Sequence, residues 1–248
     1  VIIPPALTEE QIEFYNREGY LVLPGLLNAD AADAVRGDIT TIMDVIGLGT
    51  SKLRQSNEYL KGSALDRFVN DPDLLSVAER LMGGSSTMYL PFTAVKSGNG
   101  GGQFHFHQDN QYTRFDGPGI NLWCAFTPMT EENGCLKIIP RSHREGTLPS
   151  ELSGDGDQHK KVTFEPADFV SVLMNPGDCV AFSRLTVHGS GPNNSPENRI
   201  AYAVQFHRND VNYSTDGGGT FQSLVENPRW SVGPVEHITP PKGRIDGH

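Results

Sequence analysis

The sequence predicts a mainly β protein of the α+β class, in which a helical N-terminal part supports an antiparallel sandwich or jelly roll. Two observations point to this fold. The 248 residues include 27 Gly and 17 Pro, a content that favours many turns over a helical bundle. The apolar pattern also changes from helical spacing to short runs near residue 87. Because a β-core of this size is commonly one domain, we expect 1–248 to be a single domain.

The N-terminal part, 1–85, is expected to be mostly helical. Thr8 and Gln11 form a capping box ahead of an apolar stripe, and Gly19 is expected to end the helix that they begin. The expected elements are a helix from Thr8 to Gly19, a strand at 20–23, a second helix that begins near Asn28 or Asp30, and a third helix over 73–82. Together they would form a helical buttress for the sheets.

The jelly-roll core is expected over 86–210, because short apolar or alternating runs there are separated by turn residues. The expected strands are 87–96, 104–109, 120–128, 135–139, 169–174, 178–183 and 199–206. Such punctuation is typical of antiparallel sandwiches and jelly rolls. The polar, glycine-containing segment 144–168 is predicted to be an insertion between strands. The segment 211–248 is predicted to be a loop or lid.

Charge and composition exclude several kinds of partner. The net charge is −10 and no run of Lys or Arg is present, so a nucleic-acid partner is not expected. No stretch approaches the roughly 18 apolar residues of a membrane span. The three cysteines lack C-x-x-C spacing, which argues against a disulfide framework or a zinc knuckle and favours the cytoplasm.

The first chemical motif lies at the end of an expected strand. If 104–109 is extended, His105, His107 and Asp109 share one face, because successive strand residues point to opposite sides. A His and a carboxylate two residues apart can then reach one metal ion. A polar strand end with solvated side chains explains this fragment equally well.

A third candidate ligand follows about 80 residues later. His188 comes after a tight turn and a short strand, and two glycines nearby leave it uncrowded. Two His and one carboxylate leave three sites of an octahedron open, which is the facial triad of non-haem iron(II) oxygenases. A structural zinc site would instead use four protein ligands, usually including Cys.

Arg199 is a candidate anion-binding residue. The loop before it is rich in Gly, Pro and Asn, so Arg199 is expected to open the strand that returns beside His188. Ala201 and Ala203 share its face and leave room there. A guanidinium in this position can bind a carboxylate bidentately, and Ser190 can add a hydroxyl donor. The ordinary alternative is a surface salt bridge.

Several of these fragments together resemble the phytanoyl-CoA dioxygenase family of iron(II)- and 2-oxoglutarate-dependent oxygenases. The similar stretches are the opening helix and strand (7–22), His107-Gln108-Asp109, the segment 133–143, and His188-Gly189-Ser190 with Arg199. The resemblance implies a double-stranded β-helix core of the jelly-roll type. One departure is Arg141, where the family more often has Gly.

The resemblance also implies site residues and cofactors. Iron(II) would bind to His107, Asp109 and His188, and the distal carboxylate of 2-oxoglutarate would bind to Arg199 with Ser190. By their position on the next strand, Asn121, Trp123 and Phe126 would line the co-substrate pocket. The implied reaction uses O₂, releases succinate and CO₂, and hydroxylates a C–H bond. Because Asp109 fills the position that related halogenases leave open for chloride, hydroxylation or desaturation is favoured over halogenation.

Other interpretations stay open. A cupin-like metal enzyme could use His105, His107 and His188 without 2-oxoglutarate, and a non-catalytic jelly roll could bind a ligand. A small metabolite or natural product is preferred as substrate, and an acyl-CoA is the alternative. The remaining histidines (His143, His159, His207, His237 and His248) are expected to be loop or surface residues, and Trp230 is expected to pack.

Overall fold

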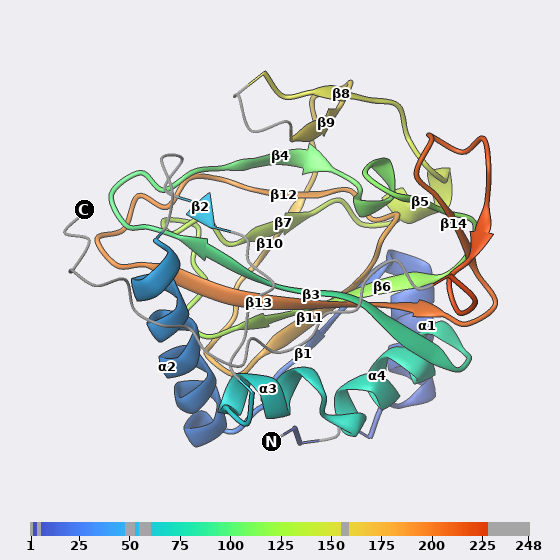
Figure 1. Ribbon diagram of the computed structural model, residues 1–248. Helices are drawn as coiled ribbons and strands as arrows, with labels where there is room; N and C mark the ends of the chain where they lie inside the picture. The colour runs from blue at the N-terminus through green and yellow to red at the C-terminus, as the bar shows by residue number, and fades with distance from the viewer. Residues whose placement is uncertain (1, 4–5, 48–52, 55–60, 155–158, 228–248) are drawn as a thin grey trace.

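The computed structural model describes residues 2–3, 6–47, 53–54, 61–154 and 159–227 (Figure 1). Two antiparallel sheets face each other. The strand order of the larger sheet is β1 (Tyr20–Leu23), β11 (Cys179–Ser183), β6 (Gly119–Ala125), β13 (Arg199–Arg208), β3 (Ser86–Lys96) and β2 (Leu53–Arg54). The strand order of the smaller sheet is β10 (Val170–Val172), β7 (Leu136–Ile138), β12 (His188–Ser190) and β4 (Phe104–His107). This arrangement confirms the predicted jelly-roll core.

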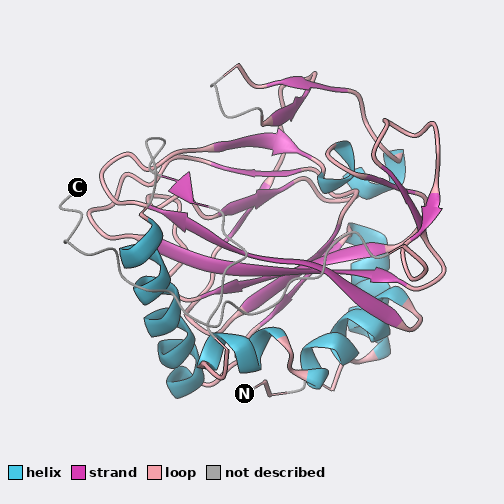
Figure 2. Ribbon diagram, viewed as in Figure 1, coloured by secondary structure: helices cyan, strands magenta, loops and turns pink. Residues whose placement is uncertain are grey.

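Helices cover the outer face of the larger sheet and leave the smaller sheet on the other side of the molecule (Figure 2). They are α1 (Glu9–Glu18), α2 (Ala29–Ile46), α3 (Ala64–Val69) and α4 (Pro72–Met82). The expected capping box of Thr8 and Gln11 is present, and Gly19 ends α1 in the left-handed conformation, with φ 82°. The short helix α3 was not expected.

Strand alternation divides the core into two layers. On β13, Tyr202 and Val204 pack toward the helices, while Ala201 and Ala203 pack between the two sheets. The layer beneath the helices takes the larger side chains, and Tyr202 is fully buried there. The alanines leave space between the sheets, and the pocket described below opens in that layer.

Several expected boundaries were wrong. The expected strand 104–109 ends at His107, and a 3₁₀ turn, η1 (Asp109–Gln111), follows it; the strand β12 was missed. The insertion 144–168 contains the hairpin β8 (Ser150–Leu152) and β9 (Lys160–Val162). The described part of the expected loop 211–248 contains β14 (Asn212–Ser214) and β15 (Gln222–Ser223), which form a sheet with β5 (Arg114–Phe115).

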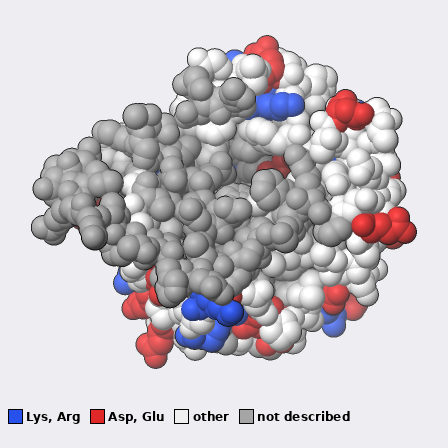
Figure 3. All heavy atoms as spheres, viewed as in Figure 1, with Lys and Arg blue, Asp and Glu red and all other residues white. Residues whose placement is uncertain are grey.

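The surface agrees with the acidic composition. On the face shown in Figure 3, the acidic and basic side chains of the described residues are scattered and form no broad basic patch. Among the helices that the structure describes, none is long and apolar enough to cross a membrane. All three cysteines are buried and free.

Candidate metal centre

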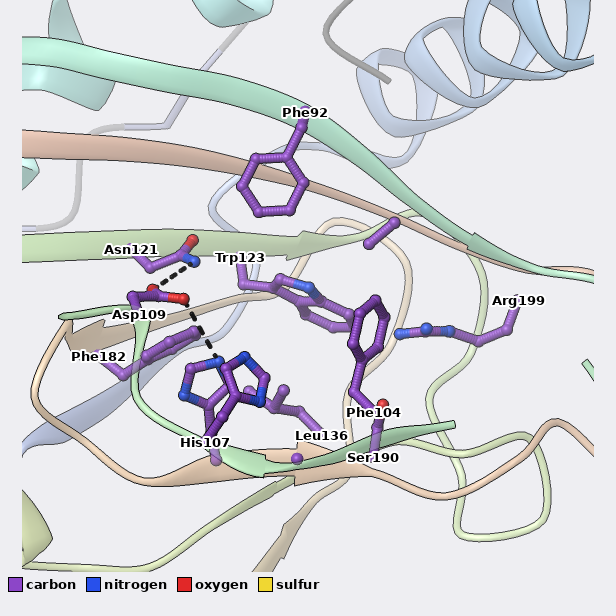
Figure 4. Close-up of a pocket in the computed structure, with 13 residues that line it drawn as sticks. Phe92, Phe104, His107, Asp109, Asn121, Trp123, Leu136, Phe182, Ser190 and Arg199 are labelled. Atoms are coloured by element: carbon purple, nitrogen blue, oxygen red, sulfur yellow. Dashed lines mark hydrogen bonds and ion pairs between the residues drawn. The ribbon is translucent and has the colours of Figure 1, made fainter. Parts of the chain in front are cut away.

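Three side chains from two neighbouring strands and the turn after one of them meet between the sheets. His107 ends β4, Asp109 begins η1, and His188 begins β12, where it pairs directly with His107. One ligand atom from each of the three lies within 4.8 Å of the other two. The Nε2 atom of His188 is 3.8 Å from Oδ1 of Asp109 (Figure 4). Both imidazoles are buried.

The two imidazoles are oriented by their own backbone. Nδ1 of His107 donates to the carbonyl oxygen of His105 at 2.7 Å, and Nδ1 of His188 donates to that of Thr186 at 2.9 Å. Because a carbonyl oxygen only accepts, each Nδ1 carries a proton, and in the neutral form of each ring the lone pair is on Nε2. Burial, together with neighbouring His188, lowers the pKa of His107 to about 3, so this ring is neutral at physiological pH.

The carboxylate of Asp109 is held from one side. Its Oδ2 accepts from Nδ2 of Asn121 at 3.3 Å and from Nε2 of Gln205 at 3.2 Å. The other oxygen, Oδ1, is the one that lies toward His188. Two imidazole nitrogens and one carboxylate oxygen therefore converge, and this donor set fits iron(II).

The expectation that His105 shares a face with His107 was wrong. Across the β4–β12 pair, His188 is opposite His107 but Ser190 is opposite Phe104, so β4 carries one extra residue between the two pairs. As a result, Phe104 and His107 line the pocket, and His105 belongs to a separate outer cavity. The strands are close here, because a Cβ at Gly189 would lie 3.0 Å from the carbonyl oxygen of Phe104.

Arg199 lines the other end of the same pocket, and a second buried basic side chain, Lys96, lies behind it. Arg199 is 1% exposed, its Nε has no hydrogen-bond partner, and it forms no ion pair with any carboxylate among the described residues. Its guanidinium lies 5.2 Å from the ring of Trp123. Lys96 is opposite Arg199 in the β3–β13 pair and is fully buried.

Lys96 is held by the segment that follows His188. Its Nζ donates to Oγ of Ser190 at 2.7 Å and to the carbonyl oxygen of Gly191. Burial, reinforced by the charge of Arg199, lowers the pKa of Lys96 to about 6, and burial lowers that of Arg199 to about 9. Two adjacent buried basic side chains, with no carboxylate bound to either among the described residues, form a site that an anion would complete. Lys96 was not predicted as a site residue from the sequence, because only strand pairing brings it opposite Arg199.

The other expected pocket residues divide between the two faces of β6. Asn121 and Trp123 line the pocket, together with Phe92 and Phe182 (Figure 4). The assignment of Phe126 was wrong. It is fully buried on the helix side, where its ring meets that of Phe68 edge-to-face at 5.7 Å. The cause is alternation, which puts even-numbered residues of this strand on the helix side.

The remaining histidines have different surroundings. The expectation for His207 was wrong, because β13 continues to Arg208 and the His207 ring is fully buried, stacked on Phe115 at 3.7 Å. His143 is half-buried and bonds to the carbonyl oxygen of Asn16, and the ring of His159 lies 4.9 Å from that of Phe104. The expectations for His237, His248 and Trp230 concern residues outside the described ranges.

Comparisons with known proteins agree with this geometry. Residues 15–201 match the family model described as phytanoyl-CoA dioxygenase (PhyH). The human peroxisomal phytanoyl-CoA dioxygenase is 26% identical over 89% of this chain and 74% of its own length. Dioxygenase lolE1 of Epichloe uncinata is 26% identical over 82% of this chain and 84% of its own length.

Solved structures share the fold at lower identity. EvdO2 from Micromonospora carbonacea, complexed with 2-oxoglutarate, superimposes with a TM-score of 0.72 at 21% identity and covers 83% of this chain and 93% of its own. The epimerase SnoN, in complex with Fe3+, alpha ketoglutarate and nogalamycin RO, superimposes with a TM-score of 0.69 at 20% identity over 95% of both chains.

Proposed function

The chain belongs to the phytanoyl-CoA dioxygenase (PhyH) family of iron(II)- and 2-oxoglutarate-dependent dioxygenases. From this premise we propose which of its residues bind the metal and which bind the co-substrate. His107, Asp109 and His188 hold the iron. Arg199, with Ser190 and Lys96, holds the distal carboxylate of 2-oxoglutarate.

The observation that carries this proposal is the contrast between the two ends of one pocket. One end offers three metal-binding atoms within 4.8 Å of one another. The other end offers Arg199, which is buried and has no ion-pair partner among the described residues. A molecule with a metal-chelating 2-oxo acid at one end and a second carboxylate at the other matches both. Leaving such a cation unpaired is unfavourable, so the bound carboxylate completes the site.

Iron(II), with 2-oxoglutarate and O₂, supplies the oxidation of a C–H bond and releases succinate and CO₂. The protein supplies orientation and shelter from water. Asn121 and Gln205 fix the carboxylate of Asp109, and the rings of Phe92, Phe104 and Trp123 form apolar walls between the sheets. Because Asp109 occupies its position, hydroxylation or desaturation is the proposed outcome rather than halogenation.

The proposed substrate is a small metabolite or natural product, and an acyl-CoA is the second candidate. The net charge of −10 disfavours a polyanionic CoA ester in the absence of a basic patch. The relatives' names include both phytanoyl-CoA dioxygenases and a fungal dioxygenase, lolE1. The cytoplasm stays a prediction, because two of the relatives are named as peroxisomal. The cupin-like alternative is disfavoured, because His105 is not part of the metal-binding cluster.

The test is anaerobic addition of iron(II) and 2-oxoglutarate, followed by the weak visible charge-transfer band of their complex. The wild type should show the band. Arg199→Ala should bind iron(II) normally but require far more 2-oxoglutarate, while Arg208→Ala, which removes a partly exposed arginine paired with Asp210, should behave as the wild type. No band in metal-loaded wild type would refute the function, and unchanged 2-oxoglutarate affinity in Arg199→Ala would refute the clamp. A metabolite screen scored by succinate release then identifies the substrate.

A further inference from the structure

A second buried arginine, Arg184, is bonded to the turn that carries Asp109. It follows β11 directly and is 3% exposed. Its Nη2 donates to the carbonyl oxygens of Asp109, at 3.1 Å, and Thr113, at 2.9 Å. Its Nε donates to Oδ1 of Asn110 at 2.9 Å. One guanidinium therefore binds the beginning, the middle and the far side of the η1 turn.

The same residue begins the loop that leads to His188. Its carbonyl oxygen accepts from the backbone N–H of Asn110 at 3.2 Å. The next residue, Leu185, accepts from Nε2 of Gln108 at 2.5 Å. Residues 108–110, which include Asp109, and residues 184–185, which begin the loop to His188, are thus joined by side-chain and backbone bonds. The separation between Asp109 and His188 depends on this junction.

The aromatic residues behind Arg184 fix its orientation. Its guanidinium lies 4.2 Å from the ring of Phe115, and Nη1 donates to Nε2 of His207. His207 in turn stacks on Phe115 with an interplanar angle of 9°. Burial lowers the pKa of Arg184 to about 10, so the side chain stays charged at neutral pH. Burial and the charge of Arg184 lower the pKa of His207, which keeps that ring neutral and able to accept.

We propose that Arg184 is a positioning residue for the metal centre: it contacts no metal ligand atom, but it fixes the turn that presents Asp109 to His107 and His188. The inference rests on the proposed function, because it assumes that these three residues bind the metal. Outer partners that orient metal ligands commonly contribute about 10–100-fold to metal affinity. Removing Arg184 should therefore weaken metal binding at Asp109 while leaving the carboxylate clamp at Arg199 intact.

Lysine cannot replace Arg184 in this role. A guanidinium is a planar fork with five N–H donors, whereas an ammonium is a single point with three. Arg184 serves four acceptors that surround it: the carbonyl oxygens of Asp109 and Thr113, Oδ1 of Asn110 and Nε2 of His207. Arg184→Lys keeps the charge and most of the volume, so it tests geometry with the least risk to folding.

A cavity beside Arg184 allows a second test. The cavity has a volume of about 360 Å³ and shares no lining residue with the metal pocket. Its lining includes Arg184, Asn110, Tyr15 and His143. In Arg184→Ala it gives added guanidinium a route to the vacated position. Rescue by guanidinium would not repair a general folding defect.

The experiment is an anaerobic titration with Co(II), a redox-stable substitute for iron(II), followed by calorimetry. We expect Arg184→Lys to bind Co(II) about tenfold more weakly than wild type and Arg184→Ala to bind it up to about a hundredfold more weakly. Millimolar guanidinium should restore part of the affinity of Arg184→Ala and change neither the wild type nor Arg208→Ala. At saturating Co(II), the 2-oxoglutarate affinity of Arg184→Lys should stay within about threefold of wild type.

Each outcome decides the question. Wild-type Co(II) affinity in folded Arg184→Lys overturns the role of Arg184, as does an equal loss in Arg208→Ala. If Arg184→Ala does not fold, Arg184→Lys alone decides. Failure of the wild type to bind Co(II) would instead refute the proposed metal site, so the two failures are distinguishable.

Discussion

We expect the binding of 2-oxoglutarate to depend on pH through Lys96. In the free protein, burial and the charge of Arg199 lower the pKa of Lys96 to about 6. At pH 7.5, only about 3% of the molecules then carry a charged Lys96. A carboxylate bound beside Lys96 and Arg199 favours the charged form and raises this pKa. Binding at pH 7.5 should therefore take up close to one proton.

The sign and size of the effect follow from linkage. Above pH 6, the free protein must gain a proton to bind, so affinity should fall by about tenfold per pH unit until the pKa of the complex is reached. The assay is calorimetry of 2-oxoglutarate binding to Co(II)-loaded protein, without O₂, in buffers of different ionisation enthalpy. The slope of the measured heat against buffer enthalpy gives the number of protons taken up.

The matched control is Lys96→Met, which keeps an unbranched chain of similar length without the amine. It should bind more weakly at pH 6, take up no proton and lose the steep pH dependence. If the wild type takes up no proton at pH 7.5, Lys96 is already charged in the free protein and the account of its burial is wrong. If Lys96→Met takes up the same proton, another group titrates.

Three further substitutions test other parts of the structure. Arg141 has a φ of 68°, a backbone conformation that favours glycine. Arg141→Gly and Arg141→Ala both lose the ion pair with Glu18, but the glycine variant should be more stable than the alanine variant by roughly 1 kcal/mol in urea unfolding. Equal stability of the two variants would contradict backbone strain at this position. Phe126→Ala should lower the free energy of unfolding by about 3–5 kcal/mol without changing 2-oxoglutarate affinity, and a selective loss of affinity would return Phe126 to the pocket. His105→Ala should bind Co(II) as the wild type does, whereas a tenfold loss would revive the cupin-like alternative.

The sequence contained enough local information to predict the fold. Capping residues such as Thr8, the glycine that ends α1 and the turns between short apolar runs act over a few residues, so pattern and structure agree there. The proposed triad was also identifiable, because His107 and Asp109 are only two residues apart in sequence and the segment around His188 has a distinctive composition.

Lys96, His105 and Arg184 were missed or misplaced because their positions depend on long-range pairing. Lys96 meets Arg199 only through the register of β3 and β13. The extra residue in β4 appears only when β4 is paired with β12, and it turns His105 away from the site that simple alternation assigned to it. Arg184 lies 75 residues from Asp109, and no pattern near either residue indicates their contact.

Each imidazole of the proposed metal site is bonded to the carbonyl group two residues before it, so the orientation of both rings is a local property of the chain. The arrangement that a metal ion needs is therefore set by short-range bonds within the chain. A ready-made set of two nitrogens and one oxygen also discriminates poorly among ions, and later first-row metals bind such sets more tightly than iron(II). If the proposed site is correct, we expect metal supply to decide which ion it holds, and surplus zinc or nickel to inactivate the protein.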